Sequence, residues 1–273
     1  MVDKLVTADW VAEHLDDPGV RLVEVDVDTE AYREGHVEGA VAWNWTSQLQ
    51  DPVTRDILSR EDFQALMSKA GIEPGTHVVL YGDNNNWFAA YALWLMELYG
   101  HQDVSLMDGG RVKWLGDNRP TTTSEPSVTA TKYEAQPADE SIRAKRDEVL
   151  QAVGSDINLV DVRSPAEFTG EVIAPPGMTE TAQRGGHIPG AKNIPWARAV
   201  NEDGTFKSPD ELKSLYEGAG VKPDGDTIAY CRIGERSSHT WFVLKYLLGY
   251  DHVKNYDGSW TEYGSMVGVP IER

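Results

Sequence analysis

The stretch AYCRIGERSSHTWF, Ala229 to Phe242, contains the residues of this chain with the clearest potential for chemistry. Cys231 is the single cysteine among 273 residues, and two cations, Arg232 and Arg236, follow it closely. The thiolate is the reactive form of cysteine, and nearby cations lower its pKa from about 8.5 to somewhere between ~3.5 and ~7.5. Two alternatives follow for Cys231: a reactive nucleophile, or a small buried apolar residue.

Composition removes the usual structural roles of cysteine and several classes of function. A single cysteine excludes an internal disulfide and a cysteine-based zinc cluster. The formal net charge is −19, whereas proteins that hold phosphate backbones present clustered lysine and arginine, so we expect no nucleic-acid partner. No apolar run approaches the roughly 18 residues of a membrane span, and no leader opens the chain, so we expect a cytoplasmic protein without a membrane partner.

The neighbouring sequence predicts how the thiol is positioned. Residues 227–230, TIAY, are typical of a buried parallel strand, and a helix is expected from about Arg236. A thiol at the carboxyl end of such a strand lies over the N-terminus of the next helix, where N–H groups and the helix dipole stabilise an anion. Gly234 would let the loop turn its N–H groups inward. We therefore expect Cys231 to have a lowered pKa, and Glu235 to point to solvent.

The spacing within this loop also bears on the substrate. Protein tyrosine phosphatases follow the pattern Cys-x-x-x-x-x-Arg, but here Arg236 comes one residue early and Ser237 occupies the phosphatase arginine position. A shorter loop makes a smaller cradle. It suits an anion centred on sulfur better than a phosphoryl group.

The chain repeats itself once. Residues 78–110 align without gaps with residues 227–259, at a constant offset of 149 positions. Gly82 occupies the position of Cys231 and is followed by DNNN, which provides neither a thiol nor a cation. A duplication explains this agreement, and only the second half has the residues for thiol chemistry.

The elements that must position these residues form two predicted domains, 1–118 and 142–273. Residues 119–141, rich in Pro, Thr, Ser and Ala, predict an extended linker. In each domain, short β-branched runs alternate with amphipathic segments, which predicts an α/β fold with a mainly parallel sheet flanked by helices. The predicted strands are 22–27, 77–82, 104–109, 158–163, 227–231 and 253–258.

Capping signals predict several helix boundaries. Ser208 is followed by a proline and then by a glutamate three positions on, which predicts a capped helix up to Gly218. Ser59 predicts a second capped start. The mostly apolar segments 87–99 and 236–248 each precede a glycine, which predicts helices packed on a sheet with glycine caps.

The motifs of the second half resemble those of the rhodanese family of sulfurtransferases, in its tandem two-domain form, over nearly the whole chain. The resemblance rests on LVDVR (159–163), RGGHIPGAKNIPW (184–196), CRIGERS (231–237) and YDGSWTEYG (256–264). It implies that the second domain is catalytic and that Cys231 attacks the outer sulfur of a small anionic donor. The thiol then holds that sulfur as a persulfide and passes it to an acceptor. It also implies that no metal or other cofactor is needed.

The resemblance also bears on the donor and the acceptor. In the family a basic residue after the cysteine accompanies thiosulfate, and Gly-Ser accompanies 3-mercaptopyruvate, so Arg232 favours thiosulfate. Ile233 stands where animal-type thiosulfate enzymes carry a second cation, and Glu167 stands where many tandem members carry an arginine. A 3-mercaptopyruvate sulfurtransferase and a non-catalytic or sulfur-carrier role stay open as alternatives. Cyanide or a thiol, possibly that of thioredoxin, is the expected acceptor.

The remaining candidate residues divide into two groups. Those expected to bind substrate are Arg232, Gly234, Arg236, Ser237 and Arg184; those expected to support the loop are Asp161, Arg163 and Glu167. Arg236 could bind donor oxygens or pair with Glu167 to brace the loop, and we favour bracing. Asp161 and Arg163 either orient the loop or form an ion pair at a strand end. Arg184 either supplements the donor site or lies on a loop surface.

Two histidines occupy matching Gly-His-x-x-Gly turns. They are His36 in the first half and His187 in the second. Because the half without the cysteine keeps its histidine, we expect both to serve the fold rather than catalysis.

Overall fold

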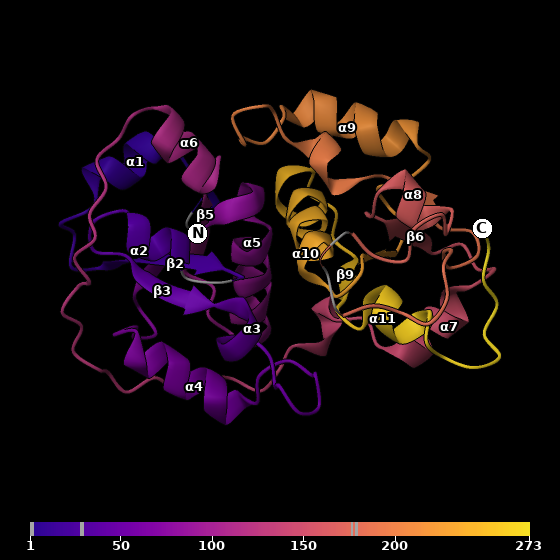
Figure 1. Cartoon of the computed structure of the whole chain (residues 1–273), viewed down its shortest axis with the longest axis horizontal. Coiled ribbons are helices and arrows are strands. Elements are labelled where there is room, and N and C mark those ends of the chain that lie inside the picture. Colours follow the sequence, from indigo (N-terminus) through magenta and orange to yellow (C-terminus); the bar gives the residue numbers. More distant parts are fainter. Residues whose placement is uncertain (1–2, 28–29, 176, 178–179) are drawn as a thin grey trace. The chain divides into compact units, whose positions relative to one another are not determined.

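The computed structural model describes residues 3–27, 30–175, 177 and 180–273. The chain divides into two units: Met1–Asp139 with Glu202–Phe206, and Glu140–Asn201 with Lys207–Arg273. Each unit contains a parallel sheet flanked by helices (Figure 1), which confirms the predicted α/β fold class. The division into 1–118, 119–141 and 142–273 stays a prediction.

The sheet of the first unit has the strand order β1-β5-β4-β2-β3, and its neighbouring strands pair in parallel. The strands are β1 (Leu5–Val6), β2 (Val20–Asp26), β3 (Val41–Asn44), β4 (His77–Tyr81) and β5 (Val104–Met107). The helices are α1 (Ala8–Glu13), α2 (Glu30–Glu34), α3 (Trp45–Gln48), α4 (Arg60–Lys69), α5 (Asp83–Leu98) and α6 (Gly110–Gly116). The largely buried α5 packs against β2, β4 and β5, and a further core cluster joins these strands to α1, α2 and α6.

The sheet of the second unit has the strand order β7-β6-β8-β9, again in parallel. The strands are β6 (Asn158–Asp161), β7 (Lys192–Asn193), β8 (Thr227–Tyr230) and β9 (Val253–Tyr256). The helices are η1 (Glu140–Ile142), α7 (Arg146–Ala152), α8 (Pro165–Phe168), η2 (Trp196–Ala199), α9 (Pro209–Gly218), α10 (Glu235–Phe242), η3 (Val243–Leu247) and α11 (Ser259–Tyr263). Asp161 pairs with Tyr230, so β6 and β8 end side by side, directly before the loop of Cys231.

The predicted strands all appear, whereas β1, β3 and β7 were missed. Each of these three lies at an edge of its sheet. These three strands have two to four residues and are mostly only partly buried, so they lack the continuous apolar run that marks a buried parallel strand.

The capping predictions are confirmed. Ser208 Oγ accepts the Glu211 N–H, and the Glu211 carboxylate accepts the Ser208 N–H at 3.1 Å, which starts α9; the helix ends at Gly218. Ser59 caps α4 through the Asp62 N–H, at 3.1 Å. A further capping box, which sequence reasoning missed, starts α8 with Ser164.

The two apolar segments predicted as helices are helical, but one begins and the other ends differently from the prediction. In α5, Asn84, Asn85 and Asn86 have φ of 51°, 53° and 66°, so a right-handed helix begins only after them. Asparagine tolerates this left-handed region better than most residues. In the second unit, α10 passes into η3, a turn of π-helix, rather than continuing as an α-helix to residue 248.

The segment predicted as a linker packs along the first unit. Residues 119–139, all of them described, form no helix or strand and only one isolated bridge, between Thr122 and His36. The Thr131 N–H donates to the Ser68 carbonyl at 3.0 Å, and Tyr133 is buried. These contacts hold the segment against its own unit.

The paired histidines serve the fold, as predicted. His36 Nδ1 lies 2.8 Å from the Tyr32 carbonyl oxygen, and its ring stacks on Tyr32. His187 Nδ1 lies 2.9 Å from the Phe168 carbonyl oxygen and stacks on Phe168 in the same manner. Each histidine thereby fixes its turn to the preceding helix.

His239 in α10 makes stability depend on pH. It is fully buried, edge-on to the Trp196 ring, and burial lowers its pKa from 6.5 to about 3. Since the unfolded chain binds this proton below about pH 6.5 and the folded chain does not, acid destabilises the fold. The free energy of unfolding should fall by about 2 kcal/mol between pH 7 and pH 5 from this group.

Urea unfolding at several pH values measures this slope. In the His239→Gln variant, the fall in unfolding free energy between pH 7 and pH 5 should be smaller by about 2 kcal/mol. In His252→Gln, at an exposed histidine, the fall should equal that of wild type. An unaltered slope in the His239→Gln variant would contradict the assignment.

Candidate active site

Cys231 lies in a tight loop between β8 and α10. The Gly234 N–H donates to Cys231 Sγ at 3.1 Å, so the loop backbone turns a donor toward the sulfur, as predicted. Gly234 has φ of 101°, and a Cβ there would lie 2.8 Å from Asp257 Cα. Only glycine fits this backbone without strain. Ser259 Oγ accepts the Cys231 N–H at 3.1 Å and holds the loop from the side of α11.

The thiol is buried and carries a raised pKa. Cys231 is 0% exposed, and burial raises its pKa, with the nearby charge of Glu235 adding to the rise. The charge of Arg236 and hydrogen bonds from Ser237 oppose this rise without reversing it. The expected lowering of the pKa is therefore wrong, because burial removes the water that stabilises a thiolate. Cys231 rests as a thiol.

Glu235 points inward rather than to solvent, which corrects a second expectation. It is 2% exposed, and its Oε2 accepts the Cys231 thiol at 3.2 Å. Its Oε1 lies 3.6 Å from Arg236 Nε and 3.9 Å from Arg232 Nη2. These two cations allow the carboxylate to stay buried, because a buried charge needs partners of opposite sign.

Arg236 pairs with Glu167, the alternative favoured from sequence. Its Nη1 and Nη2 donate to the two oxygens of that carboxylate, each at 3.0 Å. Burial raises the pKa of Glu167, but hydrogen bonding and the charge of Arg236 outweigh it and lower the pKa overall. The same carboxylate closes the capping box of α8 at Ser164. The first turn of α10 is thereby tied to α8.

The other predicted cations lie against carbonyl oxygens. Arg232 is 4% exposed and donates to the Glu180 carbonyl. Arg184, half-buried, donates to the carbonyls of Gly264, at 3.1 Å, and of Met266. Their predicted roles in holding the donor stay predictions.

Ser237 forms hydrogen bonds beneath the loop. Its Oγ donates to Asn255 Oδ1 at 2.6 Å and lies 3.1 Å from the Gly234 carbonyl oxygen. Asn255 in turn donates to Ser238 at 2.9 Å. Sequence reasoning missed Asn255 and Ser259, although both lie on or just after the strand beside β8. That adjacency was the available signal, because carboxyl ends of parallel neighbours share one edge.

Asp161 and Arg163 form a buried ion pair at the end of β6. Arg163 Nη2 lies 2.5 Å from Asp161 Oδ2, and both side chains are 0% exposed. Arg163 also donates to the Gly186 carbonyl at 2.7 Å and lies over the Trp260 ring, 4.6 Å from its centroid. The backbone N–H of Trp260 donates to the Cys231 carbonyl at 3.0 Å. The pair therefore contacts the loop through Trp260 and through Tyr230, the residue before Cys231, whose ring centroid lies 5.8 Å from Arg163 Cζ.

The corresponding position in the first unit has no room for a thiol. A Cβ on Gly82 would lie 2.1 Å from the Val25 carbonyl oxygen. The Gly82 N–H donates to Asn86 Oδ1 at 3.0 Å instead of to a sulfur. The packing around Gly82 and the sequence both indicate that the loop of the first unit does not support thiol chemistry.

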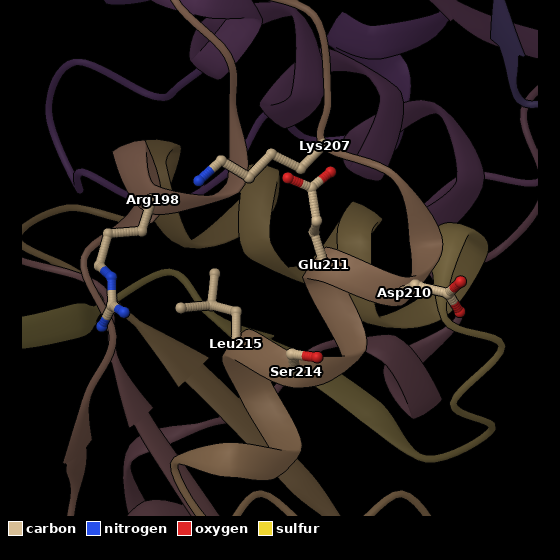
Figure 2. A pocket seen from close by; sticks show the side chains of 6 residues that line it. All are labelled: Arg198, Lys207, Asp210, Glu211, Ser214 and Leu215. Carbon is tan, nitrogen blue, oxygen red and sulfur yellow. The ribbon is translucent and has the colours of Figure 1, made fainter.

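A hollow lies apart from the predicted site residues, and two kinds of feature are absent from the described residues. A hollow of about 450 Å³ beside α9 (Figure 2) is lined by Arg198, Lys207, Asp210, Glu211, Ser214 and Leu215, none of them a predicted site residue. In the part of the chain that the structure describes, no three His, Cys, Asp or Glu side chains gather as a metal site would require. No described helix is long and apolar enough to cross a membrane.

The chain belongs to the rhodanese family. The model of the rhodanese-like domain matches it twice, at residues 7–117 and 145–266. A "Putative thiosulfate sulfurtransferase" of Haloferax volcanii is 59% identical, over 99% of this chain and 96% of that protein. The "Sulfur carrier protein TtuD" of Thermus thermophilus is 58% identical, over 98% of this chain and 96% of that protein.

A solved structure has the same fold. SseA from Escherichia coli, described with the fold and mechanism of 3-mercaptopyruvate sulfotransferases, matches with a TM-score of 0.80 and 29% identity. The match covers 95% of this chain and 99% of that one. The names of these relatives differ: one states transfer from thiosulfate, one a 3-mercaptopyruvate reaction, and one a sulfur carrier.

Proposed function

We propose that this protein transfers the outer sulfur of thiosulfate to a thiophilic acceptor through a persulfide on Cys231. The observation that carries the proposal is the Gly234 N–H directed at Cys231 Sγ, at 3.1 Å, in a loop over the start of α10. A backbone donor fixed in this manner stabilises negative charge on sulfur and needs no reorganisation during the reaction. Arg232, directly after the cysteine, supports an anionic donor in a chain of net charge −19.

The chemistry has two steps. The Cys231 thiolate attacks the outer sulfur of thiosulfate, a bond forms between Sγ and that sulfur, and the bond to the sulfonate sulfur breaks. Its electron pair leaves with sulfite. A nucleophilic acceptor, such as cyanide or a thiol, then attacks the outer sulfur of the persulfide, and the electron pair of the broken bond returns to Sγ.

Intact-mass spectrometry tests this proposal. The purified protein is incubated with thiosulfate or with 3-mercaptopyruvate, beside a Cys231→Ser variant. We expect a gain of one sulfur atom from thiosulfate alone and only with Cys231 present, and its loss when cyanide or a dithiol is added. No gain from either donor would overturn the enzyme function.

The alternatives make different predictions in the same experiment. A gain only from 3-mercaptopyruvate would support the reaction described for SseA. A persulfide that forms but is discharged only by a protein partner, thioredoxin or another, would support the sulfur-carrier role that the name of the Thermus relative states.

Arg232 should determine the donor preference. A charge-assisted hydrogen bond contributes about 1.5–3 kcal/mol, so the Arg232→Gly variant should lose about 10- to 150-fold in kcat/KM for thiosulfate. The value for 3-mercaptopyruvate should change less. Steady-state rates with both donors measure this, with Arg146→Gly, an exposed arginine of the same unit, as control. An equal loss for both donors would mean that Arg232 does not select between them.

A further inference from the structure

The carboxylate of Glu235 contacts the reacting sulfur, yet the proposed sulfur transfer assigns it no task. Its Oε2 lies 3.2 Å from Cys231 Sγ, and both residues are buried, at 2% and 0% exposure. A permanent negative charge at this point would repel both a thiolate and an anionic donor. Any function assigned to the Glu235 carboxylate must therefore account for its negative charge next to Cys231 Sγ.

The charges around this contact come from several elements. From the loop and α10, Arg232 and Arg236 face the Glu235 carboxylate. From α8, Glu167 engages Arg236 through both of its oxygens. Asp257, next to Gly234, forms a separate ion pair with Arg143, with Nε and Oδ1 2.8 Å apart. The sulfur and the Glu235 carboxylate therefore share the charge of Arg236, which Glu167 already engages.

This arrangement can hold one negative charge far more easily than two. Loss of the thiol proton to water would leave a thiolate and a carboxylate about 3 Å apart with little solvent, and like charges at such a distance do not ionise together readily. Burial and the charge of Glu235 raise the pKa of the Cys231 thiol for this reason. Movement of the proton across the existing contact leaves the total charge unchanged.

We propose that Glu235 is the general base of the sulfur transfer, taking the Cys231 proton across the thiol–carboxylate contact when the donor reacts. The inference rests on the proposed function. The proton passes from Sγ to Oε2, which leaves a thiolate and a neutral carboxylic acid. The thiolate forms its bond to the outer sulfur, and sulfite leaves with the electron pair. The proton then passes from Glu235 to the departing sulfite, and the carboxylate is restored.

The Glu235→Gln variant separates this role from a purely electrostatic one, because the two roles change the rate in opposite directions. Glutamine removes the negative charge, so the thiol pKa should fall in either case. If Glu235 only raises that pKa, the variant has more thiolate near pH 7 and takes up sulfur faster. If Glu235 is the base, uptake near pH 7 becomes about 100-fold slower, since general bases contribute roughly 10²–10⁴.

Two measurements provide the comparison. Rapid-mixing intact-mass spectrometry measures single-turnover sulfur uptake against pH, and the ultraviolet absorbance of the thiolate, relative to Cys231→Ser, measures the thiol pKa. Wild-type uptake should change little with pH around neutrality, because the proton moves within the thiol–carboxylate contact. Uptake by Glu235→Gln should rise about tenfold per pH unit up to its thiol pKa, because its thiolate must form by loss of the proton to water.

Control variants keep the test independent of folding. Glu217→Gln makes the same change at a partly exposed position on α9 and should match wild type. Glu235→Asp keeps a carboxylate with shorter reach and should restore part of the rate and the weak pH dependence. Circular dichroism checks the fold of each variant. A Glu235→Gln variant that takes up sulfur at the wild-type rate or faster near pH 7 overturns the role.

Failure of the proposed function is recognised separately. If wild type takes sulfur from neither donor, the proposed sulfur transfer is wrong. The base can then still be tested by measuring the rate at which iodoacetamide alkylates Cys231. Because Cys231 is the single cysteine, alkylation reports on it alone. A slower reaction of Glu235→Gln near pH 7 would still support the base. A faster or unchanged reaction would overturn it.

Discussion

The Glu167→Gln variant should lose about 3 kcal/mol of folding free energy at pH 7. Glutamine keeps the size and the hydrogen bonds of the α8 capping box but leaves Arg236 buried without its bidentate carboxylate. Removal of one partner of a buried ion pair costs about 3–5 kcal/mol, because the remaining charge stays out of water. Urea unfolding measures the loss, and an effect below about 1 kcal/mol would contradict a bracing role.

A double variant separates the effect of this ion pair on stability from its effect on sulfur uptake. Replacement of the whole pair, by Glu167→Leu with Arg236→Met, should cost less than Glu167→Gln alone, since apolar residues of similar size often replace a buried pair with little loss. The double variant should still take up sulfur slowly, because the charge of Arg236 no longer lowers the pKa of Cys231. Glu217→Gln, which breaks a partly exposed contact, should stay within about 0.5 kcal/mol of wild type.

The stability that Glu167 provides should also depend on pH. Its pKa is lowered in the folded protein, so its contribution is complete above the pKa of the unfolded chain and is lost as the pH falls through the folded value. The difference in unfolding free energy between wild type and Glu167→Gln should therefore shrink below about pH 4.3, the ordinary value for glutamate. A difference that does not vary with pH would mean that the charge is not the cause.

The Gly234→Ala variant should slow sulfur uptake by about 100-fold or more. The added Cβ would lie 2.8 Å from Asp257 Cα and would occupy a backbone conformation with φ of 101°. Both effects move the loop, and the N–H that contacts Cys231 Sγ moves with it. Loss of one such donor costs about 10²–10³ in rate. The strain should also lower the folding free energy by about 1–3 kcal/mol.

Gly218→Ala is the matched control for this effect. Gly218 is the last residue of α9, its φ is ordinary for a helix, and a Cβ there meets nothing within 4 Å. Alanine should therefore leave uptake unchanged and stabilise the fold slightly, by about 0.5–1 kcal/mol. Intact-mass time courses and urea unfolding measure both variants. Wild-type uptake by Gly234→Ala would show that the Gly234 N–H contributes little.

Local order was well predicted by the sequence because it depends on neighbouring residues. The cap at Ser208 arises within one helical turn, and the apolar run of β8 indicates a strand buried on both faces. The expectation that Gly234 lets the loop turn an N–H inward also rests on local sequence, and that N–H donates to Cys231 Sγ. The edge strand β7 escaped prediction because it is two residues long and only partly buried.

The chemical state of the thiol could not be predicted in the same way. Arg232 and Arg236 next to Cys231 suggested a thiolate, but a pKa depends on solvent access and on every charge nearby. Glu167, 69 positions from Arg236, takes up both of that guanidinium's terminal nitrogens. Glu235 turns inward because those cations surround it.

The sequence alone therefore determined the fold class, the duplication and the loop that presents Cys231, since apolar periodicity, capping residues and glycine positions act locally. Tertiary structure decided that Cys231 rests as a protonated thiol against Glu235. The reason is that burial and the sharing of cations among distant carboxylates arise only when the elements pack. The residues next to Cys231 in sequence identify it as the candidate nucleophile, whereas the acceptor of its thiol proton is identified only by the residues packed around it.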